Sequence, residues 1–148
     1  MPGKGHFLMG IRQHVDEWLA AHGETVIGWR RHFHTHPELS HQERHTTEFI
    51  TTVLREHGMT PTLFPTTGLM VDIGPGVGPR IAFRADLDAL PIEETAPVAF
   101  RSASPGVMHA CGHDVHTAIV LALACALNTY PLTVGLRFIF QPAEEVME

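Results

Sequence analysis

The stretch "HDVHTAIVLALACALNTYPLTVGLRFIFQ", residues 113–141, predicts the fold class of this chain. Its first part, about 113–129, is apolar enough to form a buried helix, and its last part, 132–141, has the pattern of a mostly buried strand. An earlier strand is expected within "RIAFRADLDAL", residues 80–90. Strand, helix and strand in this order favour two parallel strands joined by a helical crossover. We therefore expect an α/β fold.

The N-terminal half predicts two helices and a further strand. Apolar residues recur at helical spacing from 6 to 34, with a break expected near Gly23. After a turn at Pro37, Ser40 is expected to cap a second helix over 41–58, with Glu43 completing a capping box and Gly58 stopping the helix. A strand over 67–74 and a Gly/Pro turn over 74–80 follow. This turn leads into a strand and lacks a Lys-Ser/Thr ending, so we do not expect a phosphate-binding loop.

Composition and charge exclude several classes of protein. A chain of 148 residues with 44% hydrophobic and 18% charged residues suits one soluble globular domain. The net charge of −6 and the lack of a Lys/Arg-rich run argue against a nucleic-acid partner. The longest apolar run, 118–127, is shorter than the roughly 20 residues that cross a bilayer. We find no signal peptide and no disulfide framework among two cysteines, so a cytoplasmic location is expected.

Histidine is unusually frequent, with twelve residues, five of them in "RHFHTHPELSHQERH", residues 31–45. A metal site is one interpretation of these five. We favour an ordinary helix end and loop, where histidine suits the helix dipole. The spacing crosses a helix end marked by Pro37, and no acidic or cysteine partner is expected on the same face.

Three segments carry groups suited to chemistry: "RADLDALP" (84–91), "MHACGHDVHT" (108–117) and "FQPAEE" (140–145). Two follow strands directly and the third begins the buried helix, so all three could meet at the carboxyl ends of the strands. Cys111 and His113 would share a face of an extended segment, and thiolate and imidazole suit zinc and similar metals. Glu144 and Glu145 could then divide metal binding and proton transfer between them.

Each of these groups also has a simpler interpretation. Cys111 could be a small buried hydrophobe, a nucleophilic thiol activated by His113, or one ligand of a structural zinc site. Cys125 lies within the apolar run and is a poor candidate for a fourth zinc ligand. The acidic residues could belong to a strand-end turn and a solvated helix start. Their coincidence at three element ends favours a common site, and a cysteine-nucleophile hydrolase is kept as an alternative.

Together with "RRHFHTHPELSHQE" (30–43), the three segments closely resemble the metal-dependent aminoacylase and carboxypeptidase superfamily. The similar branch is that of the amidohydrolases, with hippurate hydrolase, N-acetyl-amino-acid deacetylases and auxin-conjugate hydrolases. The resemblance covers roughly residues 27–148. It implies hydrolysis of the amide bond of a small N-acyl amino acid, two divalent metal ions (Zn, Mn, Co or Ni), and a homodimeric full-length form.

The resemblance also implies roles for individual residues. Cys111, His113 and Glu145 correspond to metal ligands, and Glu144 corresponds to the general base. Asp86 and Asp88 lie where sister branches carry a metal-binding histidine and its supporting aspartate. Because Asp86 departs from histidine, we expect both aspartates only to support the ligands.

Family members are more than twice as long as this chain. The resemblance therefore implies that residues 1–148 form the N-terminal part of a catalytic domain in which helices cover both faces of a sheet, a three-layer α/β arrangement. The inserted dimerisation domain and the C-terminal part, with two further histidine ligands, are expected to be absent. A metal-binding but inactive fragment is accordingly a second alternative.

Overall fold

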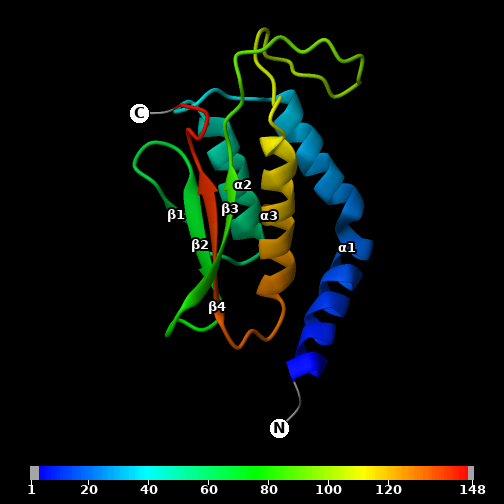
Figure 1. Ribbon diagram of the computed structural model, residues 1–148, viewed down its shortest axis with the longest axis vertical. Coiled ribbons are helices and arrows are strands. Elements are labelled where there is room, and N and C mark those ends of the chain that lie inside the picture. The colour runs from blue at the N-terminus through cyan, green and yellow to red at the C-terminus, as the bar shows by residue number, and fades with distance from the viewer. Residues whose placement is uncertain (1–3, 147–148) are drawn as a thin grey trace.

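The computed structural model describes residues 4–146. Helices α1 (Lys4–Thr35) and α2 (Arg44–Glu56) come first, followed by three strands, β1 (Thr62–Leu63), β2 (Leu69–Ile73) and β3 (Arg80–Asp86). Helix α3 (His113–Asn128) and strand β4 (Gly135–Gln141) complete the fold (Figure 1). The strands form one mixed sheet in the order β1-β2-β4-β3.

Strands β3 and β4 are parallel, and α3 connects them, as the sequence predicts. Ile81 pairs with Leu136 and Phe83 with Phe138 in this register. Strand β2 was predicted, and it pairs with β4 in the antiparallel direction. The two-residue strand β1 was not predicted, because so short a strand carries no alternating pattern.

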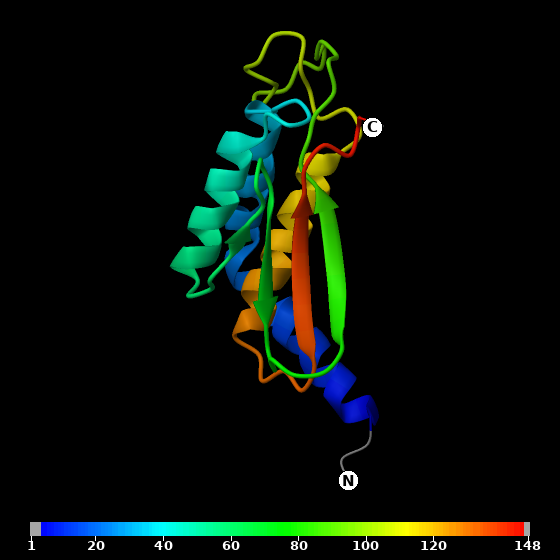
Figure 2. The same cartoon turned by 90° about the vertical axis from the view of Figure 1, so that its left-hand side faces the viewer.

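The hydrophobic core lies between the sheet and the three helices, which share one face of the sheet (Figure 2). Leu136, Phe138 and Phe140 alternate along β4 and are all buried on this face. The rings of Phe83 and Phe138 stack with centroids 5.3 Å apart. Burial of each such side chain is worth about 1.5–3 kcal/mol, so β4 and α3 anchor the domain.

The opposite face of the sheet is charged. Asp72 of β2 accepts two hydrogen bonds from Arg137 of β4, at 2.7 and 2.8 Å, and lies 3.4 Å from Arg80.

The α/β class is confirmed. Within residues 4–146 all helices lie on one face, so the second helical layer of the expected three-layer arrangement is not formed by these residues.

The predicted helix boundaries need two corrections. Helix α1 is continuous through Gly23, so the expected break is wrong. Ser40 does not cap α2, because its hydroxyl donates instead to Asp88; Glu43 is the N-cap residue and makes no side-chain cap bond. The stop at Gly58 is confirmed, since Gly58 has a left-handed φ of 76° and Met59 N–H bonds back to the carbonyl of Leu54. No helix in the described part of the chain has the length and apolar character needed to cross a membrane.

Candidate metal centre

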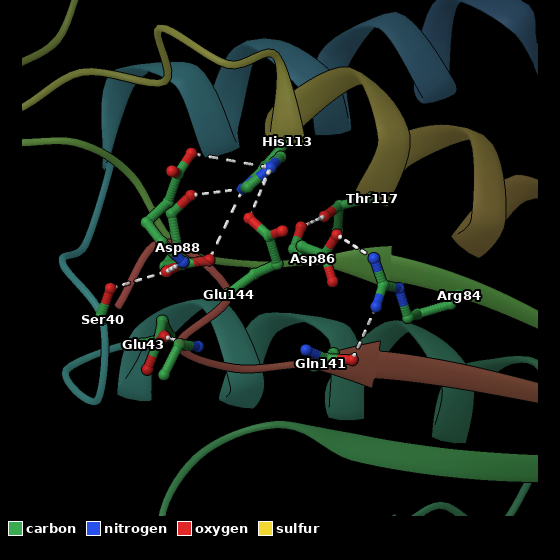
Figure 3. Close-up of polar contacts among 11 residues, drawn as sticks. Ser40, Glu43, Arg84, Asp86, Asp88, His113, Thr117, Gln141 and Glu144 are labelled. Atoms are coloured by element: carbon green, nitrogen blue, oxygen red, sulfur yellow. Dashed lines mark hydrogen bonds and ion pairs between the residues drawn. The ribbon is translucent and has the colours of Figure 1, made fainter. Parts of the chain in front are cut away.

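Four of the predicted site residues, Asp86, Asp88, His113 and Glu144, meet at one end of the sheet (Figure 3). Strand β3 ends at Asp86, with Asp88 just beyond it, and strand β4 ends at Gln141, three residues before Glu144. The first residue of α3 is His113, and the parallel crossover brings this helix start to the same end. Local topology thus gathers side chains that are far apart in the sequence.

His113 is buried and its ring is held in one orientation. Its Nδ1 donates to the backbone carbonyl of Asp88 at 2.9 Å. A carbonyl can only accept, so Nδ1 carries a proton, and in the neutral imidazole Nε2 is the nitrogen with the lone pair. Nε2 lies 3.9 Å from an oxygen of Glu144 and 3.8 Å from one of Glu145. An imidazole fixed in this way presents a metal-binding nitrogen to two carboxylates.

Asp86, His113 and Glu144 each offer one ligand atom, and these three atoms lie within 4.8 Å of one another. Asp86 is buried and accepts a 3.1 Å hydrogen bond from Arg84 at one carboxylate oxygen. The hydroxyl of Thr117, on the first turn of α3, donates to the Asp86 carbonyl at 3.1 Å. The structure therefore places Asp86 as close to His113 as a metal ligand would be. From the sequence we expected Asp86 only to support the ligands.

Asp88 joins three parts of the site. One carboxylate oxygen accepts from the Ser40 hydroxyl at 2.6 Å and from the backbone N–H of Glu145 at 2.9 Å. The other oxygen lies 3.5 Å from His113 Nδ1. Burial alone would raise the pKa of Asp88, but the hydrogen bonds from Ser40 and from the Glu145 backbone outweigh it and lower the pKa. The backbone carbonyl of Asp88 thus orients His113, and its carboxylate orients the glutamate turn.

Cys111 is exposed and lies beside the carboxylate of Glu145. The chain turns here through Gly112, whose left-handed φ of 83° suits glycine. A hydrogen bond to Glu145, some loss of hydration and the negative charges of the nearby carboxylates raise the pKa of the Cys111 thiol. A thiol in such surroundings is a weak nucleophile, because only the thiolate attacks. This geometry argues against the cysteine-nucleophile alternative.

The site has an excess of acceptors over donors. Buried oxygens of Asp86, Asp88 and Glu145 have no hydrogen-bond partner. Unpaired buried acceptors are costly, and ionised carboxylates cannot donate to one another. Bound cations would give such oxygens a partner, so the residues present fit divalent metal.

A second buried carboxylate holds the turn that carries the paired glutamates. Glu43 accepts from Ala143 N–H at 2.7 Å and from the Thr67 hydroxyl at 2.7 Å. Ala143 has a φ of 55°, a left-handed conformation that is unfavourable for alanine and needs support. The sequence predicted Glu43 only as part of a helix cap. The feature of the sequence that could have indicated this further role is the position of Glu43 in the segment 30–43, which carries the family resemblance.

A third group of charges holds the start of α3 and was not predicted. His34 of α1 lies 2.7 Å from Asp114 through Nδ1 and 3.0 Å from Glu94 through Nε2. Arg30 also reaches Asp114, at 2.9 Å. Asp114, the acidic residue directly after His113, was the feature of the sequence that could have indicated this group of charges. These contacts tie the first turn of α3 to α1 and to the loop after β3.

Residues 82–148 match the family described as Peptidase family M20/M25/M40. An N-acyl-L-amino acid amidohydrolase of Geobacillus stearothermophilus is 47% identical over 140 residues, which are 92% of this chain and 37% of the relative. The chain belongs to this family. The resemblance predicted from the sequence motifs is thereby confirmed.

A solved structure agrees on the family and fold, and a further relative in sequence carries a different name. A crystal structure from Bacillus subtilis, described as a dinuclear metal binding peptidase from the M20 family, superposes with a TM-score of 0.81 and 45% identity. The alignment covers 86% of this chain and 37% of that one. A Rhodococcus jostii protein whose name describes a glutamate–cysteine ligase is 50% identical over 82% of this chain, but the match is only 16% of its length. The chain thus spans about a third or less of these relatives.

Proposed function

We propose that this chain is part of a metal-dependent hydrolase that cleaves the amide bond of N-acyl amino acids. The observation that carries the proposal is His113, whose Nε2 is left free and faces the two glutamates. The names of the Geobacillus relative and of the Bacillus structure support the substrate class and the metal dependence. We further propose that residues 1–148 belong to the catalytic domain of a longer protein, since this chain matches only 37% of the length of each of these two relatives.

The residues that would hold two divalent ions are Cys111, His113 and Glu145, with Asp86 within reach of the same place. Thiolate, imidazole and carboxylate together suit Zn, Mn, Co or Ni. When bound, such ions supply positive charge that polarises an amide carbonyl and acidifies water. Asp88 keeps His113 in the tautomer that a ligand requires.

Glu144 is the proposed general base. Its side chain is 39% exposed, against 19% for Glu145, so it is the glutamate with better access to water and substrate. It would take a proton from the attacking water and return it to the leaving amine. Because Glu144 also lies close to Asp86 and His113, the division of roles between the two glutamates is the part of this proposal that most needs a direct test.

The test is hydrolysis of a panel of N-acetyl amino acids by the longer protein that contains this chain, before and after removal of metal with a chelator. We expect activity to be lost on chelation and restored by added Mn²⁺, Co²⁺, Ni²⁺ or Zn²⁺. Activity that survives the chelator but is blocked by thiol alkylation would instead establish the cysteine-nucleophile alternative. Stoichiometric metal binding without hydrolysis of any N-acyl amino acid would favour the inactive metal-binding alternative.

A further inference from the structure

Three histidines outside the candidate metal centre line one open cavity. This cavity, of about 390 Å³, is lined by His32, His36 and His45 together with Pro37, Glu38 and Ser104. It lies where the last turn of α1 meets the first turn of α2, at the same end of the molecule as the loop after β3 (Figure 1).

His32 and His36 are placed one helical turn apart. Helix α1 ends at Thr35, yet His36 N–H still donates to the carbonyl of His32 at 3.0 Å, which is the hydrogen bond of a helical turn. Residues at this spacing lie on one face, and the two ring centroids are 4.8 Å apart. The helix end that seemed from the sequence to separate these histidines therefore comes after the turn that joins them.

Around this cavity, the histidine rings are the groups available to bind a ligand, because the one carboxylate in its lining is already hydrogen-bonded. The ring of His32 stacks on Phe49 with centroids 4.2 Å apart, which limits its rotation. Glu38 is already engaged, because its two oxygens accept from the backbone of His45 and from the backbone and hydroxyl of Thr46. Removing Glu38 from these contacts would leave the start of α2 without its bonds.

We propose that His32 and His36 form a chelate for one transition-metal cation of the Zn²⁺, Ni²⁺ and Cu²⁺ group, distinct from the candidate metal centre. Imidazole nitrogen suits these three ions. The helical turn brings both nitrogens together before the metal arrives, so little ordering is required on binding. His45 lines the same cavity, and solvent would supply the remaining ligands. This inference does not depend on the proposed hydrolase function.

The experiment is titration calorimetry of the 148-residue chain with Ni²⁺, using Cys111→Ser and His113→Asn together to weaken the candidate metal centre. We expect this variant still to bind one equivalent of Ni²⁺. Adding His36→Gln should weaken that binding by about tenfold or more, on the scale seen when groups around a metal are removed. His36 is exposed, so its substitution should leave thermal unfolding unchanged.

His41→Asn is the matched control, because His41 is an exposed histidine of the same segment and asparagine tolerates its left-handed φ of 66°. It should leave Ni²⁺ binding unchanged. Equal Ni²⁺ affinity with and without His36→Gln would overturn the proposal. As an independent check in the otherwise unchanged chain, His36→Gln should weaken one Ni²⁺-binding step by a similar factor, and an unchanged binding isotherm would also overturn the proposal.

Discussion

Glu144 and Glu145 are neighbours in the chain, yet they approach His113 with different exposure and different partners. Glu145 has a backbone N–H bonded to Asp88 and a carboxylate beside Cys111, while Glu144 is more open to solvent. In the longer protein, Glu144→Gln should keep metal but lose kcat by about 10²–10⁴-fold, because an amide cannot accept the water's proton. Glu145→Gln should lose metal first.

Metal content by elemental analysis, measured beside kcat for each variant, separates the two roles. The cluster formed by Asp86, His113 and Glu144 makes the reverse assignment a real alternative. Loss of metal in Glu144→Gln with retention in Glu145→Gln would show that Glu144 is the ligand. If both variants keep their metal and their kcat, the site lies elsewhere.

Cys111 offers a second test at the scale of one residue. Cys111→Ser should weaken the binding of Zn²⁺ to the 148-residue chain, since a hydroxyl is a much poorer ligand for this ion than a thiolate. Cys125→Ser is not a suitable control because that thiol is buried in the core, so Ser102→Ala, on the loop after β3, is used instead. Unchanged Zn²⁺ affinity in Cys111→Ser would remove this thiol from the ligand set.

The ligand types could be predicted from the sequence, but their supports could not. Cys111 and His113 stand out because they lie two positions apart in the chain. Ser40 and Glu43 were predicted as helix caps, which is the local role that their spacing favours. Both are drawn away by tertiary contacts, with Asp88 and with the turn at Ala143, and no local pattern reports such contacts.

Among the secondary-structure elements, α2 has an effect on the site through its N-cap residue. The Glu43 carboxylate is fully buried and holds both Thr67 and the left-handed Ala143. Glu43→Gln should lower the free energy of unfolding by about 1–3 kcal/mol, because an amide NH₂ replaces one of the two buried oxygens that accept these bonds. Glu48→Gln, on the exposed face of the same helix, should change it little.

Urea unfolding followed by circular dichroism measures both variants. We also expect Glu43→Gln to weaken metal binding, since the turn that carries Glu144 and Glu145 loses one of its two carboxylate supports. Equal stability of Glu43→Gln and the unchanged chain would show that the Ala143 turn holds its shape without this carboxylate.

The elements with strong periodicity were predicted well. Helix α3 and strands β3 and β4 form over the stretches that carry apolar patterns, with ends that differ by a few residues. The antiparallel partner of β4 could not be assigned, because β2 and β4 are far apart in the sequence and no local pattern reports which strands pair. The end of α2 was predicted because the left-handed φ that stops a helix is readily adopted by glycine, and Gly58 has it.

On the scale of the whole molecule, one apolar groove lies open between α1 and α3. A cavity of about 200 Å³ has only apolar lining, from Val15, Leu19, Val26, Ile119, Ala122, Leu123 and Ala126. Leu19 and Ile119 are 40% and 57% exposed. Exposed apolar surface of this kind favours association, so we expect the isolated chain to self-associate.

Ile119→Glu should shift the chain toward monomer in sedimentation velocity experiments, because the charge would lie in the groove. Val77→Glu is the control, since Val77 is 86% exposed on the turn between β2 and β3, away from the helices. It should leave the distribution of species unchanged. A chain that stays monomeric at every concentration tested would contradict this expectation.

The contacts between α1, α3 and the loop after β3 should make stability depend on pH. Burial alone would raise the pKa of Glu94, but the bonds from His34 and from Ser102 N–H lower it below its ordinary value of 4.5. A carboxylate with a lowered folded pKa stabilises the fold above its unfolded pKa, and this contribution is lost as pH falls through the folded pKa. The chain should therefore lose stability below about pH 4.5.

The contribution of Glu94 is the difference between the unchanged chain and Glu94→Gln. Thermal unfolding of both across this pH range should show a smaller loss on acidification in the variant. Glu56→Gln, at the exposed end of α2, should follow the unchanged chain. Parallel curves for the unchanged chain and Glu94→Gln would mean that Glu94 does not cause the acid sensitivity.

Strand β4 is the last of the four strands in the sequence but lies between β2 and β3 in the sheet. Neither of those earlier strands has its main partner until residues 135–141 have been synthesised. During translation, the two N-terminal helices can form at once, while β2 and β3 must wait with their edges unpaired. Such delayed long-range pairing slows folding and exposes strands to other chains. A ribosome that pauses before Gly135 would therefore hold a nascent chain that chaperones recognise.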